Sequence, residues 1–196
     1  MPTNNIELCS ENTTQEEIIA RLEHRNKEWV KKKDGSSTDN GSLRTVVLAC
    51  IDSRVIVEKI FQAKPGELLV MKNAGNEITT DVLRSLLIAI YEIHAKFLII
   101  LGHTQCGTSI KGTDKSQKVK ERMGEETVQE LENYSHQNLE DFLGLFHPGI
   151  ESIKNNISNQ AKMVQEFFDN YIPVKDHPKI IQALYDVKSG EVTFLK

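Results

Sequence analysis

The sequence has no long apolar run and no segment of the kind that directs secretion. The chain of 196 residues contains no stretch that approaches the roughly 18–20 consecutive apolar residues of a membrane-spanning helix. Its N-terminal segment, MPTNNIELCSENTTQEE, lacks the basic and apolar regions of a signal peptide. These absences predict a cytoplasmic protein that does not enter a membrane.

Positive charge is not in excess, and cysteine is scarce. The formal net charge is −4, which argues against nucleic acid as the main partner because phosphate binding usually shows as a basic excess. Three cysteines are an odd number in a chain without a secretory signal, so a disulfide framework is not expected. Cys9 lies in a polar leader and receives no role, which leaves Cys50 and Cys106 to be explained.

Length and apolar content set the number of domains. With 39% hydrophobic residues, the chain can bury one good core and is too short for two ordinary ones. We therefore expect a single domain over residues 1–196. Within it, residues 13–33 have the pattern of an amphipathic helix, with Ile18, Leu22 and Trp29 on roughly one face, and we expect them to form an N-terminal arm.

Short apolar segments bounded by turn residues predict the strands. Those at residues 43–50, 68–74 and 96–103 are typical of buried strands. Those at residues 179–187 and 191–195 are joined by a tight turn, so the last strand should run antiparallel. Strands that alternate with helices imply an α/β fold, with a mainly parallel central β-sheet, an antiparallel C-terminal edge strand and flanking helices.

Two helices are predicted between these strands. One follows the second strand, and a long one begins near Gly149. The intervening residues 111–137 are polar and charged, and we expect an irregular or loosely helical surface excursion there. The apolar positions expected to face the core are Val82, Leu83, Leu86, Leu87, Ile90 and Ile93 in the first helix and Ile150, Ile153, Ile157, Ala161, Val164 and Phe167 in the second.

Polar side chains stand where two of the predicted strands end. ACIDSR ends the first strand with Cys50, Asp52 and Arg54, and GHTQCG ends the third with His103 and Cys106. The functional crevice of an open parallel sheet lies outside the carboxyl ends of its strands, so both sets are expected at one edge. Side chains two apart in a strand face the same way, which directs Cys50 and Asp52 into one pocket. Two thiolates and one imidazole suit zinc and leave a fourth position for water or substrate.

Each part of this pattern is weak when taken alone. A buried cysteine at a strand end is more often a small hydrophobic residue, and a lone histidine is more often a satisfied core residue. It is their joint occurrence at two strand ends that favours a metal. The other histidines lack such partners and are interpreted as structural or solvated; they are His24, His94, His136, His147 and His177.

CIDSR, KNAGN and GHTQCG occur in an order and spacing that resembles the β-class carbonic anhydrases. The resemblance runs from about Thr45 to Ile110, with weaker support from the closing ALYDVKSGEVTFL. It implies that Cys50, His103 and Cys106 hold a zinc ion. It also implies dimers or higher assemblies, in which the partner subunit completes the active-site cleft and an N-terminal helix embraces it.

The same resemblance assigns Asp52 and Arg54 to a catalytic dyad. Three positions depart from the best-known branch of the family. Lys72 stands where many members have arginine, Leu69 replaces an aromatic residue at the pocket wall, and the position near Gly41 lacks a glutamine. These departures indicate the compact, archaeal-type branch.

The expected function is the zinc-dependent reversible hydration of carbon dioxide to bicarbonate and a proton. Zinc lowers the pKa of bound water from about 15.7 toward ~7, which yields a hydroxide nucleophile near neutral pH. Asp52 would accept a hydrogen bond from that hydroxide while Arg54 keeps the carboxylate ionised and oriented. A small apolar slot for carbon dioxide could be lined by Ile51, Val70, Ala74 and the neighbouring subunit. No residue stands out as a proton shuttle.

Several alternatives stay open. Asp52 could itself become the fourth metal ligand in a closed site. The same zinc site could hydrolyse carbon disulfide or carbonyl sulfide, since zinc-bound hydroxide attacks any heteroallene. A zinc or redox regulator without catalysis is a further reading. A cysteine phosphatase fails, because its loop needs arginine six positions after the nucleophile and Ile56 stands there.

Overall fold

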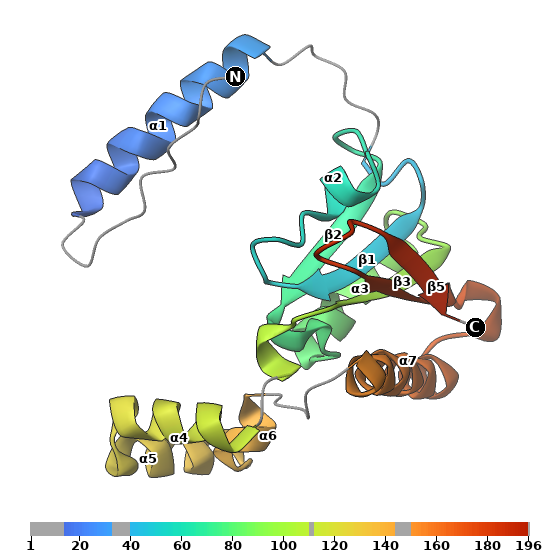
Figure 1. Ribbon diagram of the computed structural model, residues 1–196. Helices are drawn as coiled ribbons and strands as arrows, with labels where there is room; N and C mark the ends of the chain where they lie inside the picture. The colour runs from blue at the N-terminus through green and yellow to red at the C-terminus, as the bar shows by residue number, and fades with distance from the viewer. Residues whose placement is uncertain (1–13, 33–39, 110–111, 144–149, 196) are drawn as a thin grey trace. The chain divides into compact units, whose positions relative to one another are not determined.

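The computed structural model describes residues 14–32, 40–109, 112–143 and 150–195 (Figure 1). The chain divides into two compact units, Met1–Ser36 and Ser37–Lys196. The first holds helix α1 (Gln15–Lys32), in the segment where an arm was expected, and the second holds a sheet with its helices. That residues 1–196 act as one domain stays a prediction. None of the helices in the described part of the chain is long and apolar enough to cross a membrane.

Helix α1 begins with a reciprocal cap. The Thr14 hydroxyl accepts a hydrogen bond from the Glu17 backbone N–H at 3.2 Å, and the Glu17 carboxylate accepts one from the Thr14 backbone N–H at 2.9 Å. This capping box satisfies donors that have no partner within the helix. Ile19 and Leu22 are 45% and 58% exposed, so α1 carries apolar surface that its own unit leaves in contact with solvent.

The five-stranded sheet has the order β2-β1-β3-β4-β5. All pairs are parallel except β4 with β5, which confirms the mainly parallel sheet with an antiparallel C-terminal edge. In the register, Cys50 pairs with Asn73, so β1 and β2 end side by side. The strands are β1 (Thr45–Cys50), β2 (Leu68–Asn73), β3 (Phe97–His103), β4 (Lys179–Tyr185) and β5 (Val192–Leu195).

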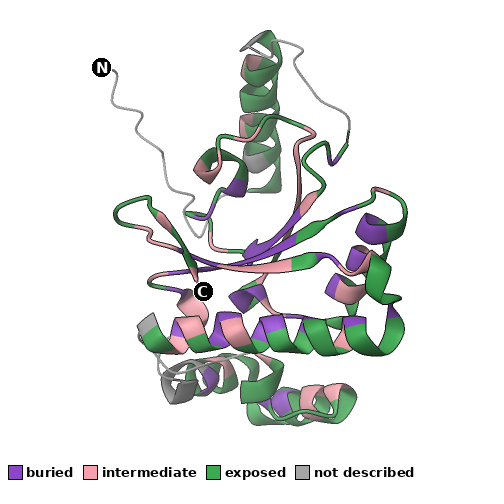
Figure 2. Ribbon diagram, turned by 90° about the vertical axis from the view of Figure 1, so that its right-hand side faces the viewer, coloured by how far each residue is buried: buried purple, intermediate pink, exposed green. Residues whose placement is uncertain are grey.

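The two central strands are buried on both faces, as parallel strands covered by helices require. Alternate residues divide between two apolar clusters, because successive side chains point to opposite faces of a sheet. Leu48 and Ile100 pack with helices α3 (Thr80–Tyr91) and α7 (Ile150–Tyr171) on one face. Val47 and Leu101 pack on the other face with the segment that carries the short helix α2 (Val57–Ile60). Figure 2 shows the buried residues concentrated in the central strands and on the inner sides of the helices.

Helix α3 ends earlier than the apolar pattern suggested. Ile93 lies beyond its last residue, and Leu87 is 36% exposed rather than buried. His94 adopts a left-handed conformation with φ of 58°, and the Ala95 N–H donates to the Ala89 carbonyl at 2.9 Å. A left-handed residue just beyond the last turn is a common way for a helix to end, and periodicity does not reveal it. In α7, Phe168 is fully buried, whereas the expected Phe167 is only partly buried.

Residues 111–137 were expected to form an irregular or loosely helical excursion, and the described part of this segment is helical. The segment forms two regular helices, α4 (Gly112–Met123) and α5 (Glu125–Ser135), and the short α6 (Leu139–Phe142) follows. Val128 and Leu139 are buried among these helices, and the Ser116 hydroxyl donates to the Glu140 carboxylate at 2.9 Å. A few apolar contacts therefore suffice to order this polar segment. Its apolar residues are too few to form a hydrophobic pattern from which two regular helices could be predicted.

Gly102 allows α7 to approach β3 closely. A Cβ on Gly102 would lie 2.6 Å from Ile157 Cδ1 and 2.7 Å from its Cγ1. Gly102→Ala is expected to lower the free energy of unfolding by about 1–3 kcal/mol, measured by urea denaturation, because this contact overpacks the core. Ile157→Ala alone is expected to cost about 2–5 kcal/mol. The double variant should cost less than the sum, since the new methyl occupies space that Ile157 leaves. If the losses in the free energy of unfolding add strictly, residues 102 and 157 are not in the tight contact described here.

Candidate metal centre

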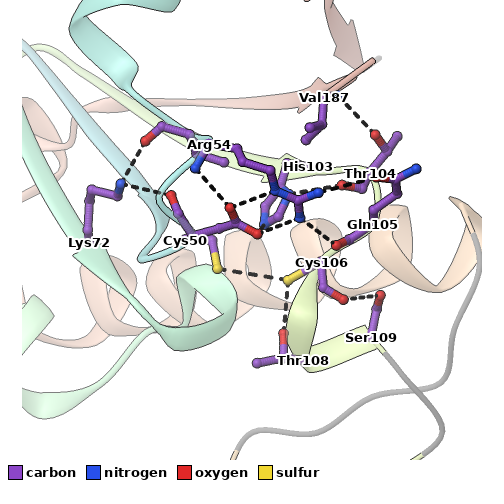
Figure 3. Close-up of polar contacts among 12 residues, drawn as sticks. Cys50, Arg54, Lys72, His103, Thr104, Gln105, Cys106, Thr108, Ser109 and Val187 are labelled. Atoms are coloured by element: carbon purple, nitrogen blue, oxygen red, sulfur yellow. Dashed lines mark hydrogen bonds and ion pairs between the residues drawn. The ribbon is translucent and has the colours of Figure 1, made fainter. Parts of the chain in front are cut away.

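The ends of β1 and β3 bring three soft or borderline ligands together (Figure 3). Cys50 is the last residue of β1 and His103 the last of β3, while Cys106 lies in the turn before the short helix η2 (Gly107–Ser109). The ligand atoms of these residues all lie within 4.8 Å of one another, and all three residues are buried. The two sulfurs are 3.8 Å apart. This is a cluster that could hold a metal ion.

The His103 ring has one satisfied nitrogen and one that lacks a partner. Its Nδ1 lies 3.0 Å from the Thr104 carbonyl oxygen, to which it can donate a hydrogen. Its Nε2 is buried and has no hydrogen-bond partner among the described residues. An unpaired buried polar atom is costly. With the proton on Nδ1, the lone pair of Nε2 is free to bind a metal, and a ligating histidine typically donates its other nitrogen in this way.

The two thiols are in hydrogen-bond contact, and this contact shifts their pKa values in opposite directions. The pKa of Cys106 is lowered to about 6, chiefly by the hydrogen bond from Cys50 and also by the Thr108 hydroxyl, whose oxygen is 3.0 Å from the Cys106 sulfur. The pKa of Cys50 is raised to about 11 by the same sulfur–sulfur contact and by burial. Both pKa shifts arise from this one contact. The first of the two thiol protons is lost at a lower pH than usual, and the second is lost at a higher pH. A bound cation would remove that second proton as well.

Asp52 and Arg54 form a close pair beside the cluster. Arg54 Nε donates to Asp52 Oδ1 at 2.9 Å and Nη2 to Oδ2 at 2.6 Å. Arg54 also donates to the Gln105 backbone carbonyl at 3.0 Å and to its side-chain oxygen at 3.2 Å. The Arg54 hydrogen bonds hold the pKa of Asp52 well below its usual range. Asp52 is therefore ionised at neutral pH, with Oδ2 4.0 Å from Nε2 of His103.

Two other residues at this edge of the sheet were either not predicted from the sequence or were assigned a different role. Gln105 was not singled out, although its left-handed backbone, with φ of 57°, presents both of its oxygens to Arg54. Lys72 was noted only as a departure from a family pattern. Its ammonium donates to the Val55 carbonyl at 2.6 Å and to the Asp52 carbonyl at 3.2 Å, which fixes the turn after β1.

The expected apolar wall is only partly as predicted. Ile51 and Ala74, which follow Cys50 and Asn73 in the sequence, are exposed. Leu69 and Val70 cannot both line it, because neighbours in a strand face opposite sides. Leu69 packs against the core cluster that α3 and α7 cover, and Val70 packs against the opposite cluster.

None of the other described histidines belongs to the group of three ligands. His24, His94 and His136 are exposed. His177 is partly buried, with Nε2 2.8 Å from the Ile172 carbonyl oxygen and its ring against Phe168. Cys9 and His147 lie outside the described residues.

Glu77 lies in the loop after β2, and burial raises the pKa of its carboxyl group. The folded chain thus holds this proton more tightly than the unfolded chain, so its contribution to stability is present at low pH and is lost as pH rises through the raised pKa. Glu77→Gln should therefore be more stable than the parent at pH 7 and differ less near pH ~4. Urea midpoints at both pH values test this, with the exposed Glu92→Gln as control. An equal difference at both pH values would contradict it.

The fold and the cluster define an α/β protein with a buried Cys–His–Cys group at the carboxyl edge of its sheet. The sequence model described as carbonic anhydrase matches residues 45–192. The chain is also 31% identical over 157 residues to YvdA of Bacillus subtilis, a protein named for the same family, and this match covers 76% of our chain and 77% of that protein. The chain belongs to the β-carbonic anhydrase family, and it is an enzyme of that family.

Two solved structures share the fold of this chain. A β-carbonic anhydrase from Trichomonas vaginalis superposes with a TM-score of 0.70 at 24% identity, over 93% of this chain and 97% of that one. A carbon disulfide hydrolase in its apo form superposes with a TM-score of 0.56 at 18% identity, over 92% of this chain and 90% of that one. At these identities the likeness concerns the fold alone.

Proposed function

We propose that the protein catalyses the zinc-dependent reversible hydration of carbon dioxide to bicarbonate and a proton. The observation that carries the proposal is the unpaired, buried Nε2 of His103, which lies together with the sulfurs of Cys50 and Cys106. Two sulfurs and one imidazole nitrogen are donors that zinc favours, and a set of three leaves a fourth position open. We assign these three residues as the zinc ligands.

The roles of Asp52 and Arg54 follow from their geometry. Zinc bound to the three ligands would act as a Lewis acid and lower the pKa of water toward ~7. Asp52 is ionised and can accept a hydrogen bond from the attacking water, which turns an oxygen lone pair toward the carbon of carbon dioxide. Arg54 binds both carboxylate oxygens and so fixes that orientation. One carbon–oxygen bond forms, bicarbonate leaves, and the proton passes to solvent.

Metal analysis and stopped-flow hydration of carbon dioxide test this proposal. The protein is expected to carry close to one zinc per chain and to acidify a buffered indicator solution after mixing with carbon dioxide, well above the uncatalysed rate. Zinc without hydration activity would favour the regulator reading. The absence of zinc would overturn the assignment of the site.

A second candidate is hydrolysis of carbon disulfide or carbonyl sulfide at the same site. It is favoured by the fold likeness to a carbon disulfide hydrolase. Access to the metal would decide between the substrates. Release of hydrogen sulfide from carbon disulfide, compared with hydration of carbon dioxide in one preparation, distinguishes them. The closed site, in which Asp52 binds the metal, would require the carboxylate to move from the position in which the Arg54 side chain binds both of its oxygens.

We also propose a homodimer or higher homo-oligomer in the cytoplasm, with α1 packed on another subunit. The support is the apolar surface of α1, where Ile19 and Leu22 are about half exposed. A chain that begins near Ser42 is expected to lose the dimer or to become insoluble, measured by light scattering against the full chain. A soluble and fully active monomer would contradict this role of α1.

A further inference from the structure

Two amide side chains lie on the buried side of α7. Asn156 is 9% exposed and Gln160 is 6% exposed, and Gln160 Nε2 donates to Asn156 Oδ1 at 3.2 Å. Each also binds the backbone of the loop that follows β2. Asn156 Nδ2 donates to the Gly75 carbonyl at 3.0 Å, and Gln160 Oε1 accepts from the Ile78 N–H at 2.7 Å. Polar groups this deeply buried are retained only where their hydrogen bonds are made.

The loop that they hold is conformationally unusual. It contains the short helix η1 (Ala74–Asn76), and two successive residues of it are left-handed, with φ of 77° at Gly75 and 52° at Asn76. Left-handed residues other than glycine are uncommon and persist where surrounding contacts fix them. The pair on α7 therefore supplies contacts that this loop needs.

The same loop touches the surroundings of both thiols. Its short helix η1 packs against β1, which ends in Cys50, against β3, which ends in His103, and against η2, which follows Cys106. A Cβ on Gly75 would lie 3.3 Å from the Thr108 hydroxyl oxygen, and that hydroxyl is the partner of the Cys106 sulfur. A shift of the Gly75 backbone would thus disturb the packing at the end of β1 and press on the hydroxyl that faces Cys106.

We propose that Asn156 and Gln160 are positioning residues for the metal centre. They hold the left-handed loop in the place where it supports the end of β1 that carries Cys50 and lies close to the Thr108 hydroxyl beside Cys106. This inference rests on the proposed zinc site, since it concerns how two of its ligands are oriented. Partners of this outer kind typically contribute about 10–100-fold in metal affinity or activity.

The test uses the full chain with Gln160→Met and Asn156→Leu, which keep most of the side-chain volume and remove the hydrogen bonds. Zinc affinity is measured by competition with a chelator, and the cobalt-loaded protein is examined for its thiolate-to-cobalt absorption. Gln165→Met is the matched control, because Gln165 donates to Asp169 on the exposed side of the same helix. Phe168→Leu is the stability control, because it alters the buried core of α7 about two turns beyond Gln160.

Each of the two variants is expected to weaken zinc binding by about tenfold and to shift the absorption band. Gln165→Met should do neither, and Phe168→Leu should lower thermal stability while leaving the band in place. If both variants lose stability but keep the parent's affinity and spectrum, the residues are structural and the inference fails while the zinc site stands. A parent chain that binds neither zinc nor cobalt would overturn both.

Discussion

Replacing any one of the three cluster residues is expected to release the metal. Cys50→Ser, His103→Ala and Cys106→Ser should each lower zinc affinity by at least about 100-fold, because a three-ligand site divides roughly 10–16 kcal/mol of binding free energy among few bonds. Zinc content after gel filtration in the presence of a chelator measures the loss. His24→Ala, on the exposed surface of α1, is the matched control and should retain full occupancy.

The three variants should also behave as a set. Because the donor atoms lie within 4.8 Å of one another, one cation would contact all of them, and loss of any one ligand leaves an incomplete set. Stoichiometric zinc in all three variants would place the metal elsewhere. If only one variant retains zinc, the residue replaced in it is not a ligand. Asp52 would then be the candidate for the third ligand.

Arg54→Ala is expected to leave zinc content nearly intact and to reduce hydration of carbon dioxide by about 10–100-fold. The substitution removes the two side-chain hydrogen bonds from Arg54 to Asp52 and leaves the one from the backbone N–H of residue 54. The pKa of Asp52 should rise toward its ordinary value near ~3.9, which still leaves the carboxylate ionised at pH 7. The loss at neutral pH would therefore report orientation rather than charge. Arg84→Ala, which breaks a similar pair with Asp81 on the exposed surface of α3, is the control.

A pH profile separates this outcome from the closed-site alternative. If the released carboxylate instead binds zinc, activity should fall at neutral pH and partly recover at alkaline pH, where hydroxide competes for the metal. If orientation alone is lost, the reduction should persist across the profile. Activity near that of the parent at every pH, at equal zinc occupancy, would reduce the pair to a structural ion pair at a strand end.

The sequence predicted the parts of the fold that depend on continuous apolar segments. Strands β1 and β3 are buried on both faces, so nearly every residue in them is apolar, and a polar residue at their ends is conspicuous. Their parallel pairing then brings Cys50 and His103 to one edge of the sheet. The candidate site could be assembled for this reason from strand ends alone.

Features that depend on single hydrogen bonds could not be predicted in this way. Asn156 and Gln160 are polar residues in an amphipathic helix, and sequence periodicity places such residues on the exposed face. Their partners are backbone groups of a loop about eighty positions earlier in the chain. The left-handed conformation of residues in that loop could not be predicted from the sequence. The order within α4 and α5 escaped for a related reason, since their few apolar residues form no continuous stripe.

The position of α7 late in the chain also bears on biosynthesis. Cys106 is made well before Asn156, Ile157 and Gln160, the residues that contact the loop after β2 and the strand carrying His103. At a ribosomal rate of about 5–20 residues per second, the interval lasts several seconds. During that time the nascent chain would carry two cysteines and a histidine whose surroundings are incomplete. Capture of the metal in its final geometry would therefore follow the emergence of α7 from the ribosome.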